Sequence, residues 1–135
     1  MEMRYRTVKP ENIIVSELRP HALPDKAQPV TEDLEPAKRF FWGEVRSGDC
    51  RMTSIQLQFI RAGFFFFDSQ IQSSGDDDSW GILHFHVYQA NGLLLWSSGA
   101  FWSPTIGGPL PWQFSSQFPV YLFDAIALAN FTNHC

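Results

Sequence analysis

The sequence predicts an all-β fold, a small antiparallel β-barrel or sandwich preceded by a proline-rich N-terminal arm. Three observations support this prediction. From residue 39 onward, short apolar runs alternate with turn-forming residues. One of these runs has strict period-two amphipathicity, and an Asn-Gly pair divides another into a hairpin. Aromatic residues make up 16% of the 135-residue chain and charged residues only 18%, which favours a folded domain over disorder.

The N-terminal segment, residues 1–38, contains five of the nine prolines. Each proline lacks a backbone N–H donor and biases the preceding residue toward extended geometry, so no long helix fits between them. Residues 12–18 are the part that can form a short element. We therefore expect residues 1–38 to be an extended arm, either a lid over the body or a strap on a neighbouring subunit. Residues 39–135 are expected to form a single β domain.

The body is divided by turn residues into strand-length apolar runs. Apart from the hairpin described next, strands are predicted at residues 40–45, 52–60, 64–71 and 112–118 and at the C-terminus. In the second of them, Ile55, Leu57 and Phe59 alternate with polar residues, which places all three on one buried face. At most one short helix is expected, near residues 119–127, because Pro119 suits a first helical turn.

The strongest local signal is a hairpin with its turn at Asn91 and Gly92, between strands at residues 80–90 and 93–103. An Asn-Gly pair suits the positive φ angles of a two-residue type I′ turn. Such a turn pairs the residues on either side of it and thereby fixes the register of the whole hairpin. In that register one side of the hairpin is almost wholly apolar, and we expect it to face the core.

The other side of the predicted hairpin combines aromatic side chains with two histidines. In this register His86 lies opposite Ser97, and His84 lies opposite Gly99. Facing side chains in a sheet lie close together, so these small residues leave free volume above the imidazoles. Small-molecule sites are mostly apolar concavities with a few polar groups, and this side has that composition. The expected lining residues are Trp80, Ile82, Tyr88, Ser97 and Phe101.

These features predict a protein that binds a hydrophobic ring-containing or polyene small molecule in an aromatic-lined pocket. His84 or His86 would orient the ligand or exchange a proton with it. One form of this function is a cofactor-free cyclase or isomerase of secondary metabolism, in which the pocket folds the ligand by proximity. Alternatively, the two histidines are hydrogen-bonded and chemically idle.

Two further functions are compatible with the sequence. The aromatic side of the hairpin suits a non-enzymatic interaction module, with that side as the interface of a homodimer or of another protein. The second of these functions is carbohydrate recognition by exposed tryptophans. It lacks support, because the acidic and amide groups expected beside such tryptophans are missing.

No cofactor and no metal are expected. His84 and His86 lie two apart on one strand and point the same way, but no third ligand follows at a recognisable spacing. The run Asp76, Asp77 and Asp78 lacks the EF-hand pattern and is expected to be a solvated loop tip.

The charge distribution bears on partners and compartment. The formal net charge is −4, and no Lys or Arg follows Arg61, so neither nucleic acid nor an anionic membrane surface is an expected partner. No apolar run approaches the roughly 18 residues of a membrane span. No secretory signal is visible at the N-terminus, which predicts a cytoplasmic protein unless the chain is the mature form of a secreted one.

The two cysteines, Cys50 and Cys135, allow one intramolecular disulfide, which would close a loop of about 85 residues. A cysteine at the last position has no core to pack into, which favours the bond. Two unpaired thiols, the usual state in a reducing cytoplasm, are the alternative.

Several short motifs follow one another in a distinctive order: Phe41-Trp42, Gly48-Asp49-Cys50, Asp76-Asp77-Asp78-Ser79-Trp80, Asn91-Gly92, Phe101-Trp102-Ser103-Pro104, Phe118-Pro119 with Leu122-Phe123, and His134-Cys135. In this order, the body resembles an uncharacterised family of small, mostly actinobacterial, β-rich proteins, a domain of unknown function. The resemblance covers about residues 41–135. It implies one compact β domain tied by Cys50 and Cys135, and it implies no role for any other residue.

Overall fold

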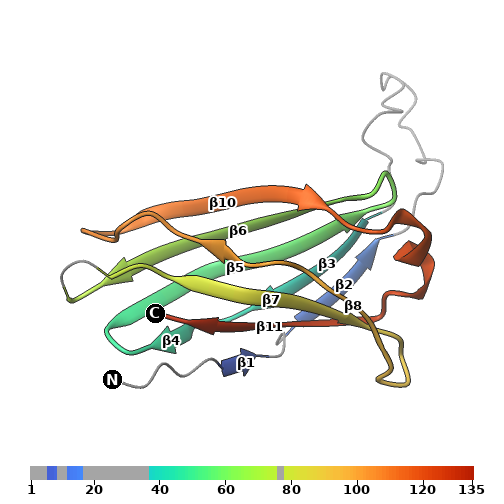
Figure 1. Ribbon diagram of the computed structural model, residues 1–135, viewed down its shortest axis with the longest axis horizontal. Helices are drawn as coiled ribbons and strands as arrows, with labels where there is room; N and C mark the ends of the chain where they lie inside the picture. Colours follow the sequence, from blue (N-terminus) through green and yellow to red (C-terminus); the bar gives the residue numbers. More distant parts are fainter. Residues whose placement is uncertain (1–5, 9–11, 17–36, 76–77) are drawn as a thin grey trace, which may run out of the picture.

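The alternating segments of the chain form two antiparallel sheets, which the computed structural model describes at residues 6–8, 12–16, 37–75 and 78–135 (Figure 1). The five-stranded sheet has the order β1 (Arg6–Val8), β11 (Leu128–His134), β7 (Gly81–Tyr88) and β8 (Leu94–Ser97), with β9 (Phe101–Trp102) also paired to β7. The six-stranded sheet has the order β10 (Leu110–Gln117), β6 (Phe64–Ser73), β5 (Cys50–Ile60), β3 (Ala37–Trp42) and β2 (Asn12–Ser16), with β4 (Val45–Ser47) paired to β5.

The two sheets pack against each other as a sandwich and do not close into a barrel, so the all-β prediction is confirmed in its sandwich form. The predicted short helix is the 3-10 helix η2 (Val120–Ala125), which follows Pro119. Within the described ranges, no helix combines the length and the apolarity needed to cross a membrane.

Side chains from the inner faces of both sheets form one aromatic core. Phe67 of β6 contacts the rings of Phe85, Trp112, Phe114 and Phe131, with centroid distances between 5.2 and 5.9 Å. Tilted and edge-to-face pairs of this kind are the arrangements that the ring quadrupole favours. The core is therefore held by contacts between rings from different strands.

The alternation in residues 52–60 predicts the inner face of β5 correctly. Ile55, Leu57 and Phe59 are at most 1% exposed, whereas Gln56 and Gln58 between them are half-buried on the outer face. Period-two alternation therefore decided the two faces of this strand, as it does for any half-buried strand.

The predicted N-terminal arm is described only in part. Strand β1 forms the edge of the five-stranded sheet beside β11, and β2 forms the edge of the six-stranded sheet beside β3. The rest of the arm up to Pro36 lies outside the described residues, and its role as a lid or strap stays a prediction.

The predicted hairpin forms, but its turn differs from the expected type I′ turn. Gln89 and Leu93 are joined by a backbone hydrogen bond of 2.9 Å, so three residues form the loop instead of two. Gly92 has a φ of 90°, whereas Asn91 does not have a positive φ. The Asn91 Oδ1 accepts a hydrogen bond from the Leu93 backbone N–H at 3.0 Å, which stabilises this alternative turn. The geometry matches a type I turn followed by a left-handed glycine.

A β-bulge at the Val87/Tyr88 step compensates for the extra loop residue. The predicted pairs Val87 with Trp96 and His86 with Ser97 are therefore present. The second strand is shorter than predicted, because the chain leaves the sheet after Ser97 and returns to it only at Phe101.

A second bulge divides β7 and overturns the prediction that its even-numbered residues share one face. In the pairing with β11, Thr132 lies opposite His84 and the next residue, Asn133, lies opposite Ile82, so Leu83 is an extra residue. An extra residue shifts the alternation by one. As a result Ile82 joins Phe85 on the inner face, and both are 0% exposed.

Candidate functional site

The outer surface of the five-stranded sheet carries the two histidines, and we call it the imidazole face. Alternation beyond the bulge puts His84, His86 and Tyr88 of β7 on this surface. Cross-strand pairing adds the neighbours Ser97 from β8 and Asn130 and Thr132 from β11. The rings of His84 and His86 lie 5.5 Å apart between centroids.

His86 is held between two hydroxyl groups. Its Nδ1 lies 2.8 Å from the Ser97 Oγ, and its Nε2 lies 3.0 Å from the Thr132 Oγ1. A neutral imidazole has one donor and one acceptor nitrogen, and a hydroxyl serves either role. The three side chains therefore form a continuous hydrogen-bonded row across β8, β7 and β11.

Partial burial, with the neighbouring His84 as a second cause, lowers the pKa of His86 below its usual value of 6.5. The folded chain therefore binds protons at this site less readily than the unfolded chain. Stability from this site is fully present above the unfolded pKa and is lost as the pH falls through the lower folded pKa. At neutral pH His86 is a neutral imidazole.

We expect the replacement His86→Gln to reduce the loss of stability that the protein shows between pH 7.5 and pH 5.5. Urea unfolding at several pH values measures this, with the midpoints of the two proteins compared at each pH. An equally steep decline in the variant would show that His86 does not contribute to the acid sensitivity.

His84 has a different hydrogen-bonding arrangement. Its Nδ1 lies 2.5 Å from the backbone carbonyl oxygen of Ser98. A carbonyl only accepts, so Nδ1 carries the proton and Nε2 has the lone pair in the neutral ring. The expected pairing of His84 with Gly99 does not form, because β8 ends at Ser97. Both ring nitrogens of His86 have hydroxyl partners, whereas only the Nδ1 of His84 is bonded to another described residue. Of the two histidines, His84 is therefore the better placed to accept a proton or a hydrogen bond from a ligand.

Apolar side chains flank the imidazoles at both ends of the face. Near the hairpin turn, Tyr88 pairs with Leu94 and Leu128, which are 51% and 37% exposed. At the other end, the 54% exposed Trp102 lies directly over Gly81, where an added Cβ would come within 2.2 Å of the indole ring. The face thus has an apolar region on each side of its polar centre.

The structure divides the predicted lining residues into two groups. Tyr88 and Ser97 lie on the imidazole face with the histidines. The other three lie within the sandwich: Trp80 and Ile82 are 0% exposed, and Phe101 stacks on Phe114 with ring centroids 4.4 Å apart. The Trp80 indole also donates to the Asn133 Oδ1 at 2.9 Å, which satisfies its only polar group. The first group borders an open surface. In the second group, Trp80 and Ile82 belong to the core, and the half-buried Phe101 packs against it.

Asn130 and Thr132 are the polar members of the imidazole face that sequence reasoning missed. Both alternate with the buried Ala129 and Phe131, so the period-two pattern of the last strand could have placed them on an outer face. The pattern does not show that β11 pairs with β7, and that pairing brings Thr132 to His86.

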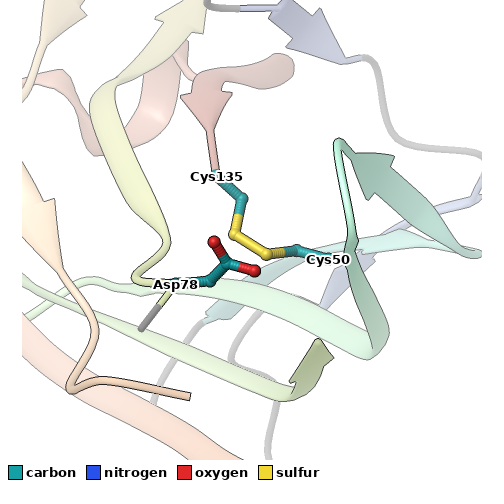
Figure 2. Close-up of side chains that lie close together, drawn as sticks. All are labelled: Cys50, Asp78 and Cys135. Carbon is teal, nitrogen blue, oxygen red and sulfur yellow. A yellow bond between two sulfur atoms is a disulfide. The ribbon is translucent and has the colours of Figure 1, made fainter. Parts of the chain in front are cut away.

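A separate cluster joins the chain terminus to the six-stranded sheet. Cys50 and Cys135 form a disulfide, and the Asp78 carboxylate points toward it (Figure 2). Ligand atoms of the three residues lie within 4.8 Å of one another. Cysteine binds metals as the thiolate, and both sulfurs are bonded to each other. In the bonded form the cluster therefore offers a metal ion only the carboxylate, which also accepts a hydrogen bond from the Ser73 hydroxyl.

Comparison with known proteins identifies a family that matches the chain but indicates no activity. A family model described as "Family of unknown function (DUF6294)" matches residues 56–135. No curated protein and no solved structure matches the chain.

Proposed function

Because the chain belongs to the DUF6294 family, whose function is unknown, we propose its function from geometry: it binds a hydrophobic ring-containing or polyene small molecule on the imidazole face. Membership of this family confirms the resemblance to an uncharacterised family, and it indicates no activity. The observation that carries the proposal is the pair of half-buried imidazoles, 5.5 Å apart, between two apolar regions.

The two kinds of group on this face suit different parts of one ligand. A ring or polyene packs against the Tyr88 ring and the side chains of Leu94 and Leu128, where apolar area leaves water. A hydroxyl group at the end of the ligand donates to the Nε2 of His84.

A catalytic form of this function is an isomerase or cyclase that needs no cofactor. The Nε2 of His84 takes a proton from one carbon of the ligand and returns it to another carbon, so no atom or electron pair is gained or lost. The hydroxyls of Ser97 and Thr132 hold the neighbouring His86 ring in a fixed orientation beside His84, and partial burial lowers the pKa of His86. General acid–base catalysis of this kind contributes about 10²–10⁴-fold to a rate.

The second candidate function is an interaction module, and exposed apolar residues favour it. Leu93, Leu94 and Trp102 are each more than 50% exposed on the five-stranded sheet or its hairpin turn. A homodimer would cover them. Sedimentation separates the candidates: a dimer that dissociates in a Leu94→Ser variant supports the interface, and a monomer that binds the probe named below supports the ligand site.

The ligand site is tested by titrating the full chain with β-ionol, a ring with a conjugated side chain that carries a hydroxyl group, while recording the imidazole carbon and proton resonances. We expect saturable shifts at His84 and His86, and about tenfold weaker binding in His84→Ala. 1-Octanol is the matched ligand without a ring or conjugation. Gln113→Ala, on the outer face of the other sheet, is the control variant and should bind as the parent does. Shifts that do not saturate, or equal affinity in His84→Ala, would reject the proposal.

A further inference from the structure

The outer surface of the six-stranded sheet carries a second cluster of polar and aromatic side chains, separate from the imidazole face. Two neighbouring rows of paired residues cross β3, β5, β6 and β10, the strands labelled in Figure 1. One row consists of Arg39, Gln58, Phe66 and Ser115, and the next consists of Phe41, Gln56, Asp68 and Gln113. We call these two rows, together with Phe64 two residues before Phe66 on β6, the amide face.

A shallow depression of about 470 Å³ lies in the amide face, and its outward-pointing lining residues are Gln58, Phe66, Asp68, Gln113 and Ser115. Small-molecule sites commonly have volumes of about 300–1,000 Å³, so this depression is large enough for a small ligand. Phe66 is 39% exposed, and Phe64, two residues earlier on the same face, is 41% exposed. Residues two apart on a strand lie about 7 Å from each other, so the two rings make a continuous apolar strip.

Hydrogen bonds within the face hold one of the amides in place. The Gln58 Oε1 accepts from the Arg39 Nε at 3.0 Å and from the Gln56 Nε2 at 3.2 Å. Because its Oε1 already accepts two hydrogen bonds, Gln58 offers its NH₂ group as a donor to a ligand. Among the residues that the structure describes, the side chains of Asp68 and Gln113 make no hydrogen bond to another protein group. Acceptors and donors are therefore available next to an exposed ring.

This combination matches the chemistry of a sugar. Each sugar hydroxyl both donates and accepts, as do amide side chains, and a carboxylate accepts from two neighbouring hydroxyls. The C–H face of a pyranose ring is apolar and carries slightly positive hydrogens, which suit the negative face of a phenyl ring. The face has one cation, Arg39, and one anion, Asp68, so its formal charge is zero. A neutral surface does not attract phosphates or nucleic acids.

We propose that the amide face is a binding site for a neutral carbohydrate, a chain of hexopyranose units that lies across Phe64 and Phe66. Phe66 packs against a sugar ring, and Asp68, Gln58 and Gln113 bind its hydroxyls. This site lies on the opposite layer of the sandwich from the imidazole face, and its occupancy does not depend on the function proposed above.

Isothermal titration calorimetry of the full disulfide-bonded chain with cellohexaose, maltohexaose and laminarihexaose, each alone, tests this site. We expect at least one hexasaccharide to bind. Its affinity should fall about tenfold or more in Phe66→Ala and in Asp68→Asn. Each variant's near-UV circular dichroism and thermal midpoint are compared with the parent's, because the altered side chains are outward-pointing and the fold should persist. Thr105→Ala, at an exposed position between β9 and β10, is the control and should keep the parent affinity.

Three outcomes would overturn the carbohydrate site: no heat from any of the three sugars at millimolar concentration, an affinity that neither amide-face variant changes, or a loss that Thr105→Ala causes equally. Tighter binding of hexagalacturonate than of the neutral sugars would overturn the assignment to a neutral ligand. Failure of β-ionol to bind leaves these results unaffected, because that probe tests the other sheet.

Discussion

Replacement of both Cys50 and Cys135 by alanine is expected to lower the free energy of unfolding by about 4.5 kcal/mol, the loop-closure entropy for a separation of 85 residues. The disulfide joins the first residue of β5 in one sheet to the residue after β11 in the other. It therefore restricts the unfolded chain over most of the domain. Alanine is preferred to serine because Cys50 is only 2% exposed, and a hydroxyl there would be buried.

Urea unfolding of the parent and of the double alanine variant measures this loss. The parent in excess dithiothreitol serves as the comparison, because reduction removes the same bond without changing the sequence. The two should lose similar stability, and their thermal midpoints should fall by roughly 10–20 °C. A loss below about 1 kcal/mol in the variant would contradict the loop-closure argument.

The second large effect is expected at Lys38, a charged residue that is only 6% exposed. Its Nζ donates to three backbone carbonyls at the end of η2, those of Phe123 at 2.7 Å, Asp124 at 3.2 Å and Ile126 at 2.8 Å. It also lies 4.9 Å from the centre of the Phe123 ring. The ammonium group is thus fully solvated by protein atoms.

The variant Lys38→Met keeps most of the side-chain volume and leaves those carbonyls without their donor. Because orphaned buried acceptors cost about 1–3 kcal/mol each and some will recruit water, we expect a total loss of about 3 kcal/mol. Urea unfolding at constant pH measures this loss.

Arg61→Met is the matched control for Lys38→Met. Arg61 also lies over the Phe123 ring, at 4.7 Å, and it pairs with Asp124 at 2.7 Å, but its side chain is 47% exposed. Surface ion pairs contribute little, so this variant should lose much less stability. Equal losses in the two variants would show that burial of the Lys38 ammonium is not what makes it important.

The strands of the body were predictable because their signals are local. Alternation identified the inner face of β5, and turn residues separated the remaining strands. The buried Lys38 was not predictable in this way. In the sequence, Lys38 is simply one of two neighbouring basic residues. Nothing local indicates that the carbonyls at the end of η2, more than 80 residues later, surround its ammonium group.

The hairpin shows where local signals stop. Asn91 and Gly92 indicated the right place for the turn and the right pairing of His86 with Ser97. They did not indicate the bulge at Leu83, because that bulge arises where β7 pairs with β11, a strand more than 40 residues further along. One extra residue moved Ile82 from the expected site into the core.

The sequence by itself determined the all-β class, the approximate strands, the short helix after Pro119 and the location of the hairpin, because each depends on residues that are neighbours in the chain. Tertiary structure alone decided which strands pair, where the bulges fall and which side chains meet. It brought Thr132 to His86, and it assembled the amide face from four strands between Arg39 and Ser115. Alternation shows which residues of one strand share a face, whereas a site also depends on the partner strands, and those are chosen by contacts between distant parts of the chain.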